Sequence, residues 1–234
     1  MSSPAADTTP AETASTEVPS ADVAPGGRRR QLRSEITRAK LLEAALTEFA
    51  AHGFEATSTR AIAVAAETQQ PQINYHFDSK ESLWRAAVDL LFDRLDEAIR
   101  SRTAALPPPS DEREAFAHQV ETFVRSVAEL PELNRIMVHE ATAVSDRLRW
   151  IVERHTRPRF DLVTSTWRRL RGDGAVRDID DVVLYYVLIG AASLPYVNAA
   201  EARLLGYDTA APQFVDAHVQ ALVDMLIGPD REVS

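Results

Sequence analysis

Three helix-sized pieces follow one another between residues 41 and 81, and each carries its own start or stop signal. In the first piece, apolar residues recur at helical spacing from Leu41 to Phe49 while the opposite face is polar, so one side needs a partner. Gly53 should end this helix, because glycine adopts a left-handed C-cap at the least cost. The run Thr57-Ser58-Thr59 then offers hydroxyl groups that can cap a second helix over residues 60–66.

The third piece begins after a short turn at Glu67. Thr68 can cap it, and Pro71 is tolerated in its first turn because the amide that proline lacks would have no helical partner there. Ile73 and Phe77 are four residues apart and give the piece an inward face. The remaining polar residues of this piece lie outside the inward face: Gln69, Gln70, Gln72, Tyr75 and His76.

This order of pieces predicts a helix-turn-helix. Small Ala63 in the second helix and Ile73 in the third allow a close crossing, with the third helix in a major groove of DNA. Glutamine amides can make two hydrogen bonds to adenine, whereas Tyr75, His76 and Lys80 suit phosphate oxygens. A glutamine-rich stretch taken alone is more often a polar surface helix, but the ordered combination favours DNA binding. The residues expected to contact DNA are Ser58, Thr59, Arg60, Gln69, Gln70, Gln72, Tyr75, His76 and Lys80.

With these signs in place, residues 34–84 resemble the N-terminal domain of tetracycline-repressor-type (TetR-like) transcriptional regulators. The matching residues are Ala44-Ala45, Phe49, Gly53-Phe54, the run from Thr57 to Ala63, Tyr75-His76-Phe77 and the run from Ser79 to Leu83. The resemblance covers about a fifth of the chain, and its specificity comes from order, spacing and residue type together. It implies an all-α fold, with a three-helix DNA-binding domain followed by a larger helical domain that binds a ligand and forms the dimer.

Three residues depart from the family pattern. The usual glycine of the turn is Glu67, and a non-glycine residue in a left-handed conformation costs about 1 kcal/mol, so the turn is expected to differ in shape. Pro71 replaces a small residue early in the recognition helix, and Asn74 replaces a common tyrosine. We therefore expect an unusual operator, with DNA binding itself retained.

The charge is unevenly distributed. The chain has a formal charge of -9, yet residues 28–80 carry eight basic and six acidic residues. A mildly basic head and an acidic body would orient the protein on DNA and discourage nonspecific coating. Residues 1–27 are expected to be a disordered acidic tail. A basic arm follows, formed by Arg28, Arg29, Arg30 and Arg33; it either reaches DNA or serves as a solubilising charge run.

Several classes of protein are disfavoured. The chain has no cysteine and its six histidines are scattered, so we expect no metal site and no cofactor. The glycines form neither a phosphate-binding loop nor a dinucleotide fingerprint. There is no apolar run of 18 residues and no signal-peptide core, so a cytoplasmic protein without a membrane partner is expected. The enzyme alternative, a carboxylate-metal helical bundle, needs two inward Glu-x-x-His pairs that the sequence lacks.

The remaining sequence predicts a body of helices between residues 81 and 228, with a short tail at 229–234. Ser79, Asp111, Pro131 and Ser145 are start signals, and Pro158 should kink or divide the helix that contains it. We expect an effector pocket among amphipathic and aromatic side chains, although each is more often a core residue. The candidates are Phe123, Met137, His139, Glu140, Arg149, Trp150, Trp167, Tyr186 and Asn198.

The last two helices are expected to form a homodimer. Residues 182–194 are almost uniformly apolar and would need cover on all sides, and an amphipathic helix follows over residues 212–227. In the family, the last two helices build a four-helix bundle between subunits. The expected seam contains Phe214, His218, Val219, Leu222 and Leu226. Two-fold symmetry would place the recognition helices about 34 Å apart on a palindrome-like operator.

These observations predict a ligand-responsive transcriptional regulator rather than an enzyme. We expect a repressor whose small-molecule effector favours a different angle of the helix that follows the head, so that DNA is released. A helical adaptor that binds protein and has lost DNA binding is the alternative, but Gln70, Tyr75, His76 and Lys80 argue against that loss.

Overall fold

The computed structural model describes residues 25–228, with side chains from Arg28 onward, and divides the chain into two units, Met1–Ile36 and Thr37–Ser234. The expected tail at residues 1–24 and the residues after Gly228 lie outside the described part. Helix α1 (Pro25–Ala56) begins in the first unit and continues into the second. Residues 25–27, which we expected to belong to a disordered tail, are therefore helical.

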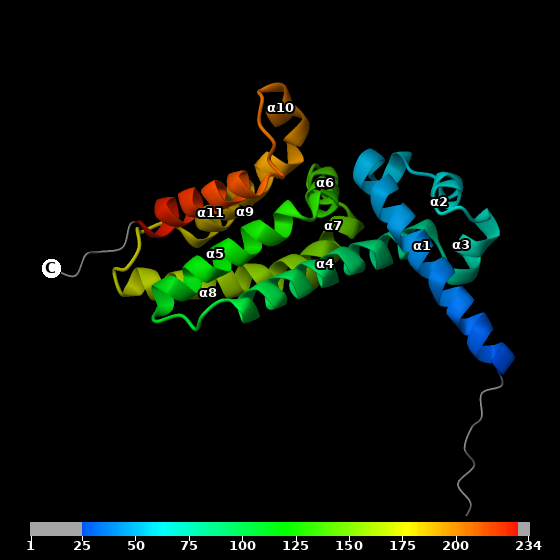
Figure 1. The fold of residues 1–234 in the computed structure, drawn as a ribbon, viewed down its shortest axis with the longest axis horizontal. Coiled ribbons are helices and arrows are strands. Elements are labelled where there is room, and N and C mark those ends of the chain that lie inside the picture. Colours follow the sequence, from blue (N-terminus) through cyan, green and yellow to red (C-terminus); the bar gives the residue numbers. More distant parts are fainter. Residues whose placement is uncertain (1–24, 229–234) are drawn as a thin grey trace, which may run out of the picture. The chain divides into compact units, whose positions relative to one another are not determined.

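The described part of the second unit is all-helical (Figure 1). A small head contains the end of α1, α2 (Thr59–Ala65) and α3 (Gln70–His76). The larger domain contains α4 (Lys80–Ala105), α5 (Glu112–Ala128), α6 (Pro131–Glu140), α7 (Asp146–Ile151), α8 (Arg157–Gly172), α9 (Asp181–Val197), α10 (Ala199–Leu204) and α11 (Pro212–Ile227). None of the described helices is long and apolar enough to cross a bilayer.

The head folds around the apolar face that the sequence predicted. Leu41, Phe49, Ile62 and Ile73 are each at most 1% exposed, so all three helices contribute to one core. Burying a side chain of this size stabilises the fold by about 1.5–3 kcal/mol relative to leaving it in water. Gly53 has φ 73° and interrupts α1 as predicted, although a further turn follows it up to Ala56.

Helix α5 lies at the centre of the larger domain and packs on α4, α6, α8, α9 and α11 (Figure 1). Phe116 on α5 and Trp167 on α8 are both fully buried, with ring centroids 5.4 Å apart. The predicted start signals are confirmed. The hydroxyls of Ser79 and Ser145 and the carboxylate of Asp111 each accept a hydrogen bond from a first-turn amide, while Pro131 opens α6.

Two prolines change helices in different ways. Pro158 is the second residue of α8, and the π-helical turn η1 (Val152–Thr156) separates α7 from α8, so the predicted division is confirmed. Pro195 lies inside α9, which continues through it to Val197. Proline lacks the amide that would bond the carbonyl four residues earlier, that of Ala191. His218 Nε2 lies 3.0 Å from this carbonyl oxygen and satisfies it from α11.

Candidate nucleic-acid interface

Helix α2 is capped by the hydroxyl run that precedes it. Ser58 Oγ accepts a hydrogen bond of 3.0 Å from the Ala61 amide, which fixes the first turn. Ser58 and Arg60 are exposed, and Thr59 is partly exposed beside them. Their side chains and the free amides of the first turn are therefore accessible to a phosphate group.

The turn between α2 and α3 keeps a left-handed residue without glycine. Glu67 has φ 52°, so it occupies the left-handed region that usually favours glycine. The Glu67 amide donates to the Val64 carbonyl and the Thr68 amide to the Ala63 carbonyl, which closes the turn. Thr68 was expected to cap α3, but Gln69 holds the N-cap position and makes no side-chain capping bond.

Helix α3 presents its polar residues to solvent and buries Ile73. Gln70, Gln72 and Tyr75 are exposed, and Tyr75 retains 67% of its accessible surface. Gln70 Nε2 donates to Thr59 Oγ1 at 3.2 Å, so the first glutamine is held by α2. Gln72 has the shape and freedom to bond a base edge directly.

The surroundings of His76 favour its neutral form by lowering its pKa. Partial burial, and then the nearby Arg38 charge, lower the pKa of His76 from its ordinary value. Its Nε2 is buried and has no hydrogen-bond partner among the described residues. The imidazole lies edge-on to Tyr75, with ring centroids 4.9 Å apart. If His76 contacts a phosphate, its neutral imidazole would therefore donate an N–H hydrogen bond without adding a positive charge.

Lys80 turns toward the end of α1. Its Nζ lies 4.3 Å from the centroid of the Phe54 ring and 3.5 Å from the Glu55 carbonyl oxygen, to which it donates. The side chain is partly exposed. The ammonium group is therefore held beside the head core and retains donors for a further partner.

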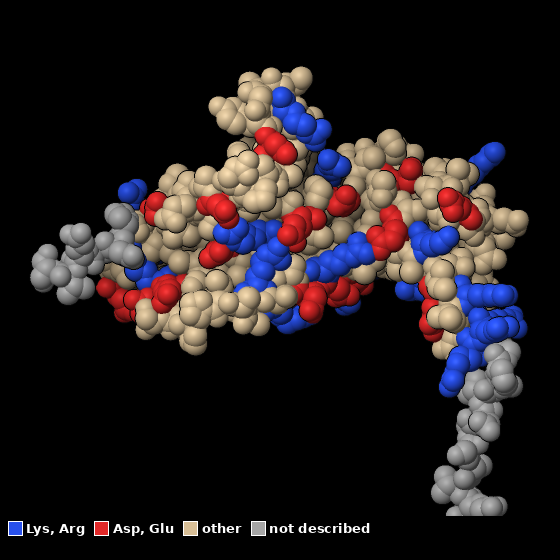
Figure 2. Space-filling model, viewed as in Figure 1, with Lys and Arg blue, Asp and Glu red and all other residues tan. Residues whose placement is uncertain are grey.

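The expected basic arm lies in the first unit. Arg28, Arg29, Arg30 and Arg33 are exposed along the start of α1, where Figure 2 shows basic side chains gathered together. In the same unit, Gln31 Nε2 donates to Glu35 Oε1 at 3.1 Å.

Comparison with known proteins shows which family the head of this chain resembles. Residues 41–87 match the family model described as "Bacterial regulatory proteins, tetR family". The head of this chain is therefore similar to the DNA-binding domain of TetR-family regulators. The biofilm operon icaADBC negative transcriptional regulator IcaR of Staphylococcus aureus (strain Newman) is 33% identical over 60 residues, which are 26% of this chain and 32% of that protein. The match thus spans about a third of that curated relative.

Solved structures share this fold over most of the chain. The probable transcriptional regulatory protein RHA5900 is 25% identical with a TM-score of 0.58, and the likeness covers 83% of this chain and 99% of that one. The structure of AibR in complex with isovaleryl coenzyme A and operator DNA has 18% identity and a TM-score of 0.63, with 82% and 99% covered. The TetR family comprises transcription regulators and not enzymes.

The expected effector residues of this TetR-like chain lie in different surroundings. Trp167 is a core residue whose Nε1 donates to the Ile179 carbonyl at 3.1 Å. Arg149, Tyr186 and Asn198 are exposed, and Phe123 and Met137 are partly buried against the core. His139, Glu140 and Trp150 lie near the end of α1 and the start of α4: His139 beside Gly53, Glu140 paired with Arg147, and Trp150 against Trp84.

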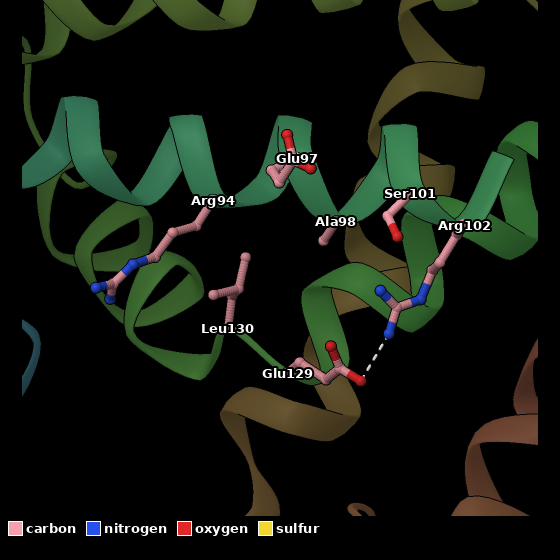
Figure 3. Close-up of a pocket in the computed structure, with 7 residues that line it drawn as sticks. All are labelled: Arg94, Glu97, Ala98, Ser101, Arg102, Glu129 and Leu130. Atoms are coloured by element: carbon pink, nitrogen blue, oxygen red, sulfur yellow. Dashed lines mark hydrogen bonds and ion pairs between the residues drawn. The ribbon is translucent and has the colours of Figure 1, made fainter. Parts of the chain in front are cut away.

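A pocket of about 450 Å³ lies elsewhere, between α4 and the turn that joins α5 to α6 (Figure 3). It is lined by Arg94, Glu97, Ala98, Ser101, Arg102, Glu129 and Leu130. Arg102 Nη2 donates to Glu129 Oε1 at 2.6 Å, and Arg94 pairs with Glu43 of the head. None of the expected effector residues lines this pocket. Its α4 residues recur at helical spacing, but a polar face of this kind is typical of a solvent-exposed helix surface and does not by itself indicate a pocket.

The expected dimer residues divide into two groups. Val219, Leu222 and Leu226 are at most 7% exposed because α11 packs on α5 within the same chain. His218 uses both ring nitrogens inside the chain, with Tyr196 and with Ala191. Phe214 is partly exposed. Among the described residues of α9 and α11, the exposed large apolar or aromatic side chains are Val182, Val183, Tyr186, Val187 and Leu194 of α9 and Met225 of α11.

Proposed function

We propose that this TetR-like chain is an effector-responsive repressor that binds a palindrome-like operator as a homodimer. The observation that carries the proposal is the exposed polar face of α3, held on a buried helix-turn-helix core by Ile62 and Ile73. A recognition helix needs this combination, because its inward face fixes the angle of entry while its outward face meets base edges. The family match over residues 41–87 supports this use of the face.

The proposed contacts fall into two classes. Gln72, and Gln70 if it leaves Thr59, would bond base edges and select sequence. Ser58, Thr59, Arg60 and Gln69 at the helix starts, with Tyr75, His76 and Lys80, would contact phosphates and fix the register. The arm of Arg28, Arg29, Arg30 and Arg33 would add sequence-independent, salt-sensitive attraction.

The apolar surface of α9 supports the homodimer. Five of its large apolar or aromatic side chains are about half exposed or more. A soluble monomer rarely exposes a contiguous apolar patch of this kind, so a second copy is the expected cover. The two-fold axis of such a dimer would give the operator its palindrome-like form. The proposed regions are an arm and head at residues 28–80 and an effector and dimerisation domain at 81–228.

Release by a small molecule rests on the larger domain. AibR, a protein of the same fold, was solved in complex with isovaleryl coenzyme A and operator DNA, which supports a ligand-responsive role for this chain. We propose that a small-molecule effector binds the larger domain of this chain and shifts the population away from the DNA-competent arrangement. Such a regulator would act in the cytoplasm, where its operator lies.

The test begins by selecting bound DNA from a random pool with the wild-type protein. Tyr75→Ala combined with Lys80→Ala should weaken binding to the selected DNA and lower the salt slope by about 1 for each phosphate interaction that the substitutions remove. Tyr207→Ala with Arg203→Ala removes an exposed tyrosine and cation from the larger domain and is the matched control. If both pairs behave alike, the assigned DNA face is wrong. If the wild type enriches no DNA, a protein-binding adaptor becomes the better explanation.

A further inference from the structure

The end of α1 contains a sharp corner formed by Gly53, Phe54 and Glu55, called here the α1 corner. Gly53 has φ 73° and ψ 172°, and Thr57 Oγ1 donates to its carbonyl at 2.8 Å. Phe54 stacks on Phe49 of the head core at 5.9 Å. Because α2 and α3 follow directly, the direction of this corner sets where the DNA-binding helices point.

One arginine of the larger domain covers this corner. Arg147 lies in the first turn of α7, and its guanidinium carbon is 3.9 Å from the centroid of the Phe54 ring. Its Nη2 lies 3.2 Å from Glu55 Oε1. A planar guanidinium can stack on an aromatic face and pair with a carboxylate at its edge simultaneously, in a fixed geometry that the point charge of a lysine ammonium does not reproduce. Arg147 therefore contacts two successive residues of the α1 corner.

The same guanidinium is fixed from the side of the larger domain. Arg147 Nε lies 3.2 Å from both carboxylate oxygens of Glu140, at the end of α6. Glu140 is 6% exposed, so moving Arg147 away would leave a buried carboxylate without its cation. Arg147 is thus tied to α6 more firmly than to Glu55, whose side chain is 82% exposed.

Helix α6 also contacts the corner directly. A Cβ placed on Gly53 would lie 3.3 Å from His139 Nδ1, closer than side-chain carbons ordinarily approach. Gly53 therefore serves two purposes: it permits the positive φ and leaves room for His139. His139 and Glu140 are neighbours on α6, so one short segment of the larger domain meets the corner both directly and through Arg147.

We propose that Arg147 is the positioning residue that transmits movements of α6 and α7 to the DNA-binding head, with Glu140 as its anchor. The inference rests on the proposed function for its DNA consequence, but the joint itself is a property of the chain. It reassigns His139 and Glu140 from effector contacts to the joint. A ligand that displaces α6 or α7 would turn the α1 corner, because Arg147 cannot remain on both Glu140 and Phe54.

The first test measures head position without DNA. The chain has no cysteine, so Val64→Cys on α2 and Asp161→Cys on α8 introduce two spin labels at exposed positions. Labelled chains diluted in unlabelled wild type give one labelled chain per dimer. Arg147→Lys should broaden or shift the distance distribution between the labels. Arg135→Lys, at an exposed position of α6, should leave it unchanged.

A second variant covers the case in which Arg147→Lys fails to fold. Glu55→Lys changes an exposed residue and places a cation against Arg147. It should therefore also broaden or shift the distance distribution between the two labels. A folded Arg147→Lys or Glu55→Lys protein whose distribution superposes on the wild type would overturn the proposal.

The second test uses DNA selected by the wild type. Arg147→Lys should lower affinity about 5- to 150-fold, the usual range of coupling between sites, with an unchanged salt slope. A reduced salt slope would instead make Arg147 a phosphate contact and overturn its positioning role. A wild type that selects no DNA refutes the proposed function alone, because the label distances still decide whether the joint exists.

Discussion

The imidazole of His155 lies flat on the ring of Phe92, with centroids 4.1 Å apart and planes 6° from parallel. His155 belongs to the π-helical turn and Phe92 to α4, so the stack joins the irregular turn to the helix that leads to the head. Trp150 meets the imidazole edge-on at 5.3 Å. This buried histidine is consequently a candidate for acid sensitivity.

His155 should make the fold lose stability as the pH falls below about 6.5, the ordinary histidine pKa. Burial lowers its pKa; Asp89 opposes this effect, while Arg159 and Arg154 reinforce it. Asp89 Oδ1 lies 2.9 Å from His155 Nε2 and also accepts a hydrogen bond from Arg154. The unfolded chain therefore binds the proton more readily, and the stabilisation is complete only above about 6.5.

The comparison variant is His155→Phe, which keeps a ring on Phe92 and removes the titration. Wild type and variant share His76 and His218, whose pKa values burial also lowers, so the difference between their unfolding free energies isolates position 155. The unfolding free energy of the wild type minus that of the variant should be constant above pH 7 and should decrease below about pH 6.5. Parallel denaturation profiles from pH 7 downward would contradict the assignment.

Local signals made most helix boundaries predictable. Ser79, Asp111 and Ser145 cap helices because a cap depends on a few neighbouring residues. The course of α9 through Pro195 was not predictable in this way, since His218 satisfies the freed carbonyl from another helix. Similarly, the left-handed Glu67 violates a local preference that the packed turn overrides.

The candidate site was predictable to a different extent in each domain. The head places Ile62 inside and Gln72 outside as helical periodicity requires. The joint at Arg147 was missed because its partner Glu55 is distant in the sequence and an isolated arginine carries no pattern. The sequence predicts a helix end at Gly53, but the closeness of Gly53 to His139 depends on tertiary structure.

Replacing Glu67 by glycine should stabilise the chain by up to about 1 kcal/mol, because glycine removes the cost of φ 52°. Removing the Glu67 side chain should cost little stability, because its ion pair with Lys40 is exposed and the two charged atoms are 4.0 Å apart. Glu67→Ala is the matched control: it loses the same pair but keeps the backbone strain. Urea denaturation should rank glycine above alanine, and the reverse order would show that the strain is absent.

The two faces of the C-terminal helices should respond differently to substitution. Tyr186→Asp places a charge on the exposed face of α9 and should convert the proposed dimer to monomer with little change in the fold. Leu222→Ala removes a side chain that is 2% exposed and should cost about 2–5 kcal/mol of stability. Sedimentation and thermal unfolding distinguish these effects. A dimeric Tyr186→Asp protein would place the interface elsewhere.

His218 should stabilise α9 through the carbonyl that Pro195 leaves without an amide partner. Nε2 must carry the proton to donate to the Ala191 oxygen, so Nδ1 accepts from the Tyr196 hydroxyl at 3.0 Å. Burial raises the pKa of Tyr196 to about 12, so this hydroxyl remains a donor. His218→Phe removes both bonds and should cost on the order of 2 kcal/mol or more, measured by urea denaturation.

A double-mutant cycle tests whether proline is the cause. Pro195→Ala restores an amide that can bond the Ala191 carbonyl within α9, so His218→Phe should cost less in that background than in the wild type. Tyr196→Phe is the control, because it removes the other hydrogen bond of His218 and should not depend on residue 195. If the cost of His218→Phe is the same in both backgrounds, His218 stabilises the chain by its packing and not by replacing the missing amide.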